Sequence, residues 1–279
     1  MAANSTFQMV NERGWRMGFA NLLRKENRDW WRTRRWWIST IIWLLLINGI
    51  AYAMMWTPMP DPSAPNPMTA PTVMLSPEAA VTGALGNLVV MVGLFTPIGA
   101  IIAMQGSIID EKKSGTAAWI MSKPVSRTAF IVTKALANSV ALLLVSLVIQ
   151  WVILYALFAL RGSTPPPGPL AFGVALLALN LLFYLTLTLM LGTLFNDRGP
   201  VIAIPVGVLF AAQFLMNNFP TLALLTPWGL IFPNGVEPPL ALQAMMGMPL
   251  TTIVPIVATL AWIVIFIGVA IWRFRRDEF

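Results

Sequence analysis

The sequence predicts an all-α integral membrane protein with six transmembrane helices. Apolar residues make up 57% of the chain and charged residues 10%, against about 45–50% and about 25% in soluble globular proteins. So few charges could not cover the surface of a soluble fold of 279 residues. In addition, six apolar runs are each long enough to cross ~30 Å of hydrocarbon at ~1.5 Å per residue.

Two residue types are missing altogether. The chain has no cysteine, which excludes disulfides and thiolate metal sites, and no histidine, which removes the commonest general base and metal ligand. The net charge of +7 would suggest nucleic acid in a soluble protein, but here the distribution of the charges along the chain has to be considered first.

The first predicted element is an amphipathic helix within 13–35. On a helical wheel one arc of about 100° is apolar, interrupted by Glu26, and Arg, Lys and Asn occupy the rest. The arc consists of Trp15, Phe19, Leu22, Leu23 and Trp30. Such a helix is expected to lie in the membrane plane against anionic lipid. Arg interleaved with Trp at 30–37 could also bind single-stranded nucleic acid, but the apolar run that follows favours the membrane interface.

Six transmembrane helices should follow. They are predicted at 36–56, 81–106, 131–160, 170–194, 200–217 and 250–272. The second must end before the four charges at 110–113, which would together cost about 10 kcal/mol at mid-membrane. The third run exceeds the bilayer thickness, so it should project into water near Lys134. Pro97 and Pro205 are expected to kink their helices.

The connections differ in composition. Residues 57–80 hold seven prolines, and 161–169 read RGSTPPPGP, so both are predicted to be extended connectors without a packed core. The 218–249 segment is apolar but divided by six prolines. No helix of spanning length fits between them, and short helices in the outer leaflet are predicted instead.

The positive charges set the predicted orientation. Seventeen of the eighteen Lys and Arg residues lie in the N-terminal segment, the 107–134 connection, the 195–199 turn and the C-terminal tail. Arg161 is the single exception. Because cytoplasmic loops are enriched in Lys and Arg, both termini and the 107–134 connection are predicted to be cytoplasmic.

The cytoplasmic loop at 107–130 contains a compact pattern. Its residues 111–127 read EKKSGTAAWIMSKPVSR. Gly115 and Pro124 bracket about two helical turns, which Ser114 or Thr116 could cap. Trp119 could anchor this helix at the interface or in a partner's pocket. A membrane-hugging loop without a partner is the alternative.

These residues resemble the permease subunits of type-2 ABC transporters. The resemblance is carried by a Glu after the second span, a Ser-Gly-Thr, a Ser-x-Pro-Val-Ser-Arg, a Lys early in the third span and the ending WRFRRDEF. These are Glu111, Ser114–Thr116, Ser122, Pro124–Arg127, Lys134 and 272–279. Six spans, two cytoplasmic ends and broken helices before the last span also match that family.

The resemblance implies that the 107–130 loop carries a coupling helix, which docks on a separate ATPase subunit. The residues implied in that contact are Glu111, Gly115, Thr116, Trp119, Met121, Ser122, Pro124, Val125 and Arg127. Trp119 and Met121 are the expected anchors. Glu111 and Arg127 could pair with the partner or with each other, and Glu111 is expected to be buried at a joint beneath the helix.

The missing motifs narrow the mechanism. The chain has no GxxxxGK[ST] loop, so it is expected to be a non-catalytic subunit that binds no cofactor, with ATP and Mg²⁺ on the partner. Apart from Lys134 the spans contain no ionisable residue, which argues against a proton relay. Their polar residues are predicted mainly to form interhelical hydrogen bonds, with Gln213 and Asn217, on one face of the fifth span, as possible substrate contacts.

The sequence therefore favours the permease subunit of an ATP-driven exporter of a hydrophobic or amphiphilic substrate. We expect it in the plasma membrane of a prokaryote, paired with a second permease copy or a relative and with two ATPase subunits. An ABC-type subunit that drives an accessory process such as metalloenzyme maturation, a secondary carrier and an intramembrane enzyme are the alternatives. The sequence names neither the substrate nor the direction of transport.

Overall fold

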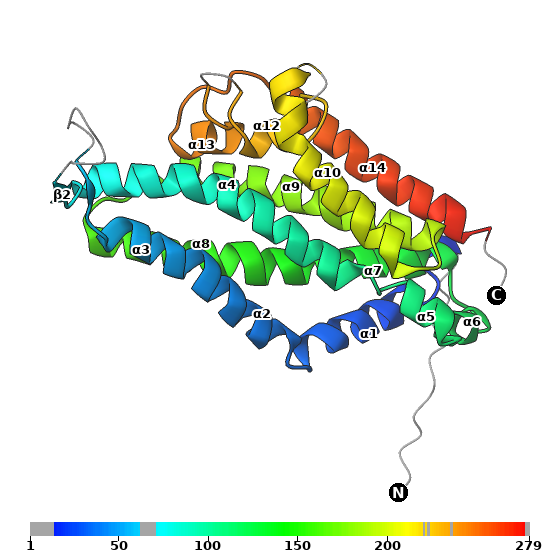
Figure 1. Cartoon of the computed structure of the whole chain (residues 1–279). Helices are drawn as coiled ribbons and strands as arrows, with labels where there is room; N and C mark the ends of the chain where they lie inside the picture. Colours follow the sequence, from blue (N-terminus) through cyan, green and yellow to red (C-terminus); the bar gives the residue numbers. More distant parts are fainter. Residues whose placement is uncertain (1–13, 62–70, 220, 222–223, 235–236, 277–279) are drawn as a thin grey trace, which may run out of the picture.

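The structure, a computed structural model, is a bundle of long helices that run side by side (Figure 1). It describes residues 14–61, 71–219, 221, 224–234 and 237–276. Within these residues, helices account for most of the chain, as predicted. A single antiparallel pair of two-residue strands is the departure from an all-α fold in the described part.

Five helical segments among the described residues are long and apolar enough to cross a membrane. The first comprises α2 (Arg35–Trp43), a π-helical turn at Leu44–Gly49 and α3 (Ile50–Trp56). The second comprises α4 (Pro77–Met104) and α5 (Ile109–Lys113). The third comprises α7 (Arg127–Leu142), a π-helical turn at Leu143–Val148 and α8 (Ile149–Arg161). The fourth and fifth are α9 (Pro167–Leu194) and α14 (Val254–Phe274).

A sixth helix, α10 (Arg198–Asn218), contains the span predicted at 200–217. Its stretch Arg198–Ala212 is apolar but shorter than the other five. The six-span arrangement therefore stays a prediction. As expected, α4 ends before the charges at 110–113, and Pro97 and Pro205 lie inside α4 and α10.

The two π-helical turns connect the first and third segments. Asn48, in the first turn, donates a hydrogen bond from Nδ2 to Gln150 Oε1 at 2.9 Å. Gln150 Nε2 then donates to the carbonyls of Val145 and Thr40, at 2.8 and 3.3 Å. A π turn interrupts the usual helical hydrogen-bond ladder. The Gln150 amide gives the Val145 and Thr40 carbonyls a side-chain donor, in addition to the Leu44 N–H that Thr40 already accepts. The prediction that polar residues join neighbouring spans is confirmed here.

Helix α9 lies at the centre of the bundle, between α4, α13 (Leu240–Met245) and α14. Asn180 of α9 is buried and donates to the carbonyl of Gly93 in α4 at 2.8 Å. In the same region the indole of Trp228 donates to the hydroxyl of Tyr184 at 3.1 Å. These bonds pair the Asn180 NH₂ group, the Trp228 indole and the Tyr184 hydroxyl inside an apolar core, where an unpaired group is costly, while Asn180 Oδ1 has no partner among the described residues.

The connections predicted from their prolines contain a strand pair and two short helices. Strand β1 (Met59–Pro60) pairs with β2 (Thr72–Val73), with Met59 opposite Val73. The two strands are extended, as predicted for the 57–80 connection, but they pair with each other, and α4 already begins at Pro77 within it. Likewise α9 already begins at Pro167, inside the predicted 161–169 connector. Helices α12 (Trp228–Ile231) and α13 are short, as predicted for 218–249.

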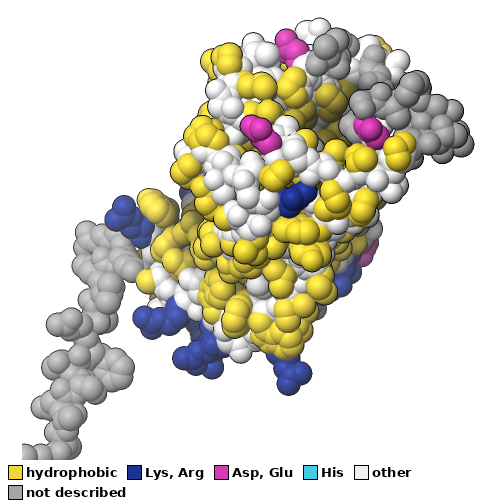
Figure 2. Space-filling view, turned by 90° about the vertical axis from the view of Figure 1, so that its left-hand side faces the viewer, with side chains coloured by type: hydrophobic (Ala, Val, Ile, Leu, Met, Phe, Trp, Pro, Cys, Tyr) yellow, Lys and Arg dark blue, Asp and Glu magenta, His cyan; other side chains and the backbone are white. Residues whose placement is uncertain are grey.

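The charges are distributed unevenly between the two ends. Figure 2 views the end that carries β2, where apolar side chains predominate and Lys and Arg gather toward the lower edge. Arg161 lies at this end and holds it together, since its guanidinium donates to the carbonyls of Met55 and Leu75 at 3.0 and 2.7 Å. Helices α1 (Phe19–Trp31), α5 and α6 (Thr116–Met121) and the last described residues lie at the opposite end (Figure 1).

Candidate functional site

The loop between the second and third segments folds around one glycine. Gly115 has a φ of 73°, in the left-handed region that favours glycine, and it precedes the first residue of α6. The predicted side-chain cap by Ser114 or Thr116 is wrong. Neither hydroxyl caps the helix, and the two instead share a hydrogen bond of 2.8 Å with each other. The glycine conformation starts the helix without a cap.

Helix α6 has an inner and an outer face. Ala117 and Ile120 are buried beneath it, whereas Ala118 and Trp119 are exposed. The Trp119 ring is 62% exposed, and the ammonium of Lys123 lies 3.3 Å from its centroid. Met121 is half-buried against the apolar core. Of the two predicted anchors, Trp119 therefore lies free on the surface, while Met121 packs partly into the protein.

The second half of the loop is fixed by the N-terminal segment. The amide of Ser126 donates to the carbonyl of Met17 at 2.9 Å. Gly18, with a φ of 75°, lies directly against the side chain of Val125, and a Cβ built there would come within 2.8 Å of it. Ser122 Oγ donates to the carbonyl of Trp119 at 2.8 Å, and Pro124 is exposed. Val125 is thus an inward contact of the loop, and Ser122 and Pro124 border its outer face.

Arg127 begins α7 and reaches the C-terminal end of α14. Its guanidinium donates to the carbonyl of Arg275 at 2.7 Å, and the Arg275 guanidinium donates to Thr128 Oγ1 at 2.9 Å. The predicted alternative of a Glu111–Arg127 pair is therefore not formed. The bonds tie the end of the loop to the last transmembrane helix.

Glu111 instead belongs to a buried ion network beneath α6. Its Oε1 accepts hydrogen bonds from Lys134 of α7 at 2.9 Å and from Lys25 of α1 at 2.5 Å. Lys134 also donates to Glu26 of α1 at 3.0 Å. Glu111 is half-buried at this joint, as expected. The third segment runs for 35 residues, longer than a bilayer requires, but the Lys134 side chain itself is 3% exposed and faces protein, not water.

Two further contacts complete the network. The indole of Trp30 in α1 donates to Asn138 Oδ1 in α7 at 2.8 Å, and Asn138 Nδ2 donates to the carbonyl of Lys134 at 2.8 Å. Burial lowers the pKa of Lys25, but the hydrogen bond to Glu111 and the charges of Glu26 and Glu111 outweigh it and raise the pKa overall. A raised lysine pKa means that this side chain stays charged at every physiological pH.

The N-terminal helix differs from its prediction in what it contacts. It is interrupted, with a 3₁₀ turn at Gly14–Arg16, α1 at Phe19–Trp31 and a separate α2 from Arg35. Part of its apolar arc packs against α7, with Leu22 and Trp30 buried by protein, whereas Trp15 is 49% exposed. Glu26, which interrupts this arc in the sequence, faces Lys134. The sequence shows Glu26 and Lys134 as charges in apolar surroundings, but no pattern in it predicts that they form an ion pair.

The predicted substrate contacts are Gln213 and Asn217, both in α10. The backbone of α10 runs through Gln213 and Asn217, but their side chains lie outside the described part of the structure. Their assignment stays a prediction. Of the other polar residues, Asn87 and Asn218 bond to carbonyls within their own helices.

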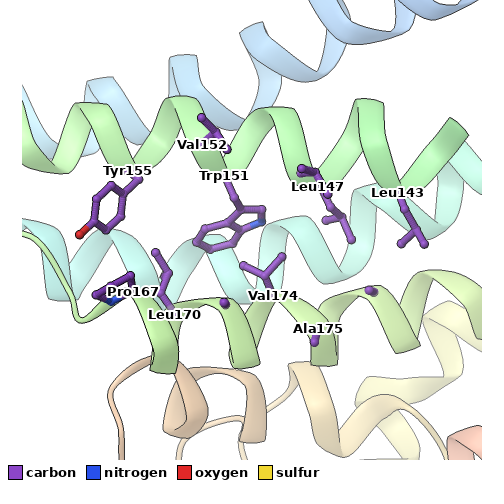
Figure 3. A pocket seen from close by; sticks show the side chains of 12 residues that line it. Leu143, Leu147, Trp151, Val152, Tyr155, Pro167, Leu170, Val174 and Ala175 are labelled. Carbon is purple, nitrogen blue, oxygen red and sulfur yellow. The ribbon is translucent and has the colours of Figure 1, made fainter. Parts of the chain in front are cut away.

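A cavity missed by the sequence analysis lies between α8 and α9. It has a volume of about 530 Å³, and its walls are almost wholly apolar. Figure 3 shows Trp151 and Val152 of α8 above Leu170, Val174 and Ala175 of α9. The indole nitrogen of Trp151 is buried and has no hydrogen-bond partner among the described residues. Such a surface suits an apolar molecule or lipid chain.

The described residues contain no group of three acidic side chains placed to hold a metal ion.

Comparison with known proteins agrees with a transport role. Residues 20–279 match the model of a family described as "ABC-2 family transporter protein". The chain is also 27% identical over 210 residues to the uncharacterized transmembrane protein YxlG of Bacillus subtilis (strain 168), covering 71% of this chain and 76% of that protein.

Proposed function

The chain belongs to the ABC-2 transporter family, and from this premise we propose that it exports a hydrophobic or amphiphilic substrate with energy from a separate ATPase subunit. Membership makes it a membrane-spanning permease component of an ABC transporter. The absence of a phosphate-binding GxxxxGK[ST] motif supports the proposal that ATP and Mg²⁺ bind to the partner. Two ATPase subunits and a second permease copy complete the proposed assembly, in a prokaryotic plasma membrane with both termini cytoplasmic.

The observation that carries the proposal is the placement of Trp119. It is a large aromatic side chain, 62% exposed, on a short helix whose other face is buried. Tryptophan is one of the residues that most often contribute the binding energy of a protein interface. Ala118, Ser122, Lys123 and Pro124 are exposed around it. We take these residues with Trp119 as the docking face for the ATPase.

The residues behind the docking face give it mechanical continuity. Glu111 connects the α5–α6 segment to α1 and α7 through Lys25 and Lys134, and Arg127 connects the start of α7 to the end of α14. A displacement of α6 would therefore act on several spans together. This supports a role in transmitting force, with Glu111, Gly115, Thr116, Val125 and Arg127 as positioning residues.

The test is Trp119→Ala in the full chain, co-expressed with its ATPase, which is sought first in the adjacent reading frame. We expect ATPase binding to weaken by at least about 2 kcal/mol, or about 30-fold, with loss of ATP-driven transport. The chain should still insert and fold because the ring is exposed. Met121 is left unchanged because it also packs into the core.

Tyr52→Ala is the matched control, since this aromatic side chain is 53% exposed on α3, at the end of the molecule opposite α6 (Figure 1). It should bind the ATPase with unchanged affinity. If Trp119→Ala binds the ATPase and transports as well as the unchanged chain does, the docking face lies elsewhere. ATP hydrolysis by the purified chain alone would refute the subunit assignment itself.

A further inference from the structure

A polar chamber of about 380 Å³ lies beside the ion network, enclosed by α1, the start of α2, the α4–α5 connection, α7 and Arg198. Two oxygen atoms of residues in its wall are buried without a hydrogen-bond partner among the described residues. They are Glu111 Oε2 and Ser107 Oγ. Buried polar atoms of this kind are rare in folded proteins, and a bound water, ion or ligand group would satisfy them. The chamber therefore has room and unused hydrogen-bonding capacity together.

An apolar groove of about 590 Å³ adjoins this chamber on the membrane side. Its walls include Ile38, Ile42 and Trp43 from the first span and Leu142 from the third. Trp30, Arg35, Ile102 and Ala103 line the chamber and the groove alike. The two spaces are thus neighbouring parts of one site, polar at one end and apolar at the other.

The charges of the chamber divide into paired and unpaired groups. Glu26 and Glu111 both pair with Lys134, and Arg198 pairs with Asp110 at 2.6 Å. By contrast, the carboxylate of Asp29 and the guanidinium of Arg35 have no hydrogen-bond or ion-pair partner among the described residues, and both residues are exposed. Arg34, which lines the groove, is also exposed, and its guanidinium also has no partner among the described residues. An acid and adjacent arginines are therefore available to a ligand.

We propose that this composite site binds a phospholipid-like amphiphile from the inner leaflet whose headgroup carries both a phosphate and an ammonium. The phosphate binds Arg35, whose guanidinium suits the geometry of a phosphate group. The ammonium binds Asp29, with Glu111 Oε2 and Ser107 Oγ as further acceptors. The acyl chain occupies the groove between α2 and α4. This inference rests on the proposed function in placing α1 on the cytoplasmic side.

Charge complementarity distinguishes this site from the apolar cavity between α8 and α9. That cavity has no charged residue in its wall, so it selects no headgroup. Each part of the composite site has a volume within the range of about 300–1,000 Å³ that is usual for small-molecule sites. The site lies at the junction of α1 and α2, where the first span begins. The Trp-rich and Arg-rich sequence there, WWRTRRWW at 30–37, is typical of the lipid headgroup level.

The experiment uses the full chain, reconstituted without ATPase or ATP in phospholipid vesicles. The probes are phosphatidylethanolamine and phosphatidylglycerol with the same photoactivatable acyl chain, so that they differ only in the headgroup. After illumination, labelled peptides are quantified by mass spectrometry. Labelling at 38–43 and 99–103 is divided by labelling of the exposed surface of α14, which reports on bulk lipid.

We expect the phosphatidylethanolamine probe to label the groove at least fivefold more than the phosphatidylglycerol probe. Asp29→Asn should abolish this preference, and Arg35→Gln should lower groove labelling by the phosphatidylethanolamine probe at least fivefold. Both side chains are exposed, so the variants should fold, and unchanged melting temperatures would confirm it. Glu78→Gln and Arg28→Gln, exposed charges outside the site, are the matched controls and should keep the preference.

Equal labelling by the two probes, or a preference that survives Asp29→Asn, would overturn the site, because the groove would then contain only bulk lipid. The outcome is independent of ATPase binding. Failure of the chain to bind an ATPase would refute the proposed function and leave the labelling result intact, whereas loss of headgroup preference would refute this site and leave the coupling role intact.

Discussion

The ammonium of Lys134 lies where α1, α5 and α7 meet, and its carboxylate partners come from two of these helices. Glu26 is 108 residues away and Glu111 is 23 residues away. A buried charge is tolerated when it is paired and hydrogen-bonded. Because the three groups share one cluster, the loss of a single member leaves another charge uncompensated inside the protein.

The first prediction concerns this lysine. Lys134→Ala should destabilise the protein by about 3 kcal/mol, the lower end of the range for breaking a buried pair, because Lys25 still compensates both carboxylates in part. Denaturant or thermal unfolding in detergent measures the effect. Lys113→Ala is the matched control, since Lys113 pairs with Asp197 at the exposed surface, and it should cost less than about 1 kcal/mol.

Equal losses of stability in the two variants would contradict the prediction, since a shared loss would reflect the general removal of a lysine. A milder effect of Lys134→Ala than of Lys113→Ala would do the same. The comparison is fair because both residues are lysines with a carboxylate partner, and they differ in burial: the Lys134 side chain is 3% exposed and that of Lys113 is 58% exposed.

At this scale the sequence indicated where a site lies but not how it is built. Glu26 interrupts an apolar arc and Lys134 interrupts an apolar run, so each could be recognised as an anomaly. Their pairing depends on how α1 packs against α7, which no local pattern encodes. The predicted side-chain cap of α6 is wrong because Gly115 adopts a left-handed conformation, and the helix begins without a cap.

Among the helices, α9 and α13 pack tightly against each other at a glycine. Gly173 of α9 faces α13, and a Cβ built there would lie 2.6 Å from the carbonyl oxygen of Ala241 and 2.2 Å from Met245 Cγ. Real Cβ atoms do not approach a backbone this closely, so the glycine is required for the short helix to pack where it does. It fixes the 218–249 segment against the bundle.

The second prediction follows from this contact. Gly173→Ala should destabilise the protein by about 1–3 kcal/mol, the usual cost of overpacking, because the backbone of α13 must move. Gly83→Ala is the matched control, as Gly83 lies in α4 with nothing within 4 Å of a built Cβ. That change should stabilise by up to about 1 kcal/mol, since alanine favours a helix. If both variants raised the melting temperature, the close contact between Gly173 and α13 would be refuted.

The elements themselves followed from composition more readily than their contacts. Apolar length predicted the long helices, and the prolines of 218–249 predicted short ones, because proline removes a helical donor. The strand pair β1–β2 was missed, since each strand has two residues and its pairing joins positions on either side of the 62–70 segment. The π turns were missed as well, because their stabilising contact between Asn48 and Gln150 is 102 residues apart in sequence.

Over the whole molecule, the segments rich in Lys and Arg gather at one end. Helices α1, α5 and α6 lie there, with Arg198 bound to Asp110 and Arg127 bound to the carbonyl of Arg275 (Figure 1). Segments far apart in the sequence are thus neighbours on a single surface. This agrees with a cytoplasmic face made from the N-terminal helix, two connections and the C-terminal end.

The last prediction is the orientation of that surface. The chain lacks cysteine, so single cysteines can be introduced at Lys123 beside α6 and at Asn234 between α12 and α13, both exposed. Because positive charges are retained on the cytoplasmic side, an impermeant thiol reagent should label Asn234→Cys in sealed cells and Lys123→Cys only after the membrane is opened. Labelling of Lys123→Cys in sealed cells would invert the topology, place α6 out of reach of any cytoplasmic ATPase and refute the coupling role.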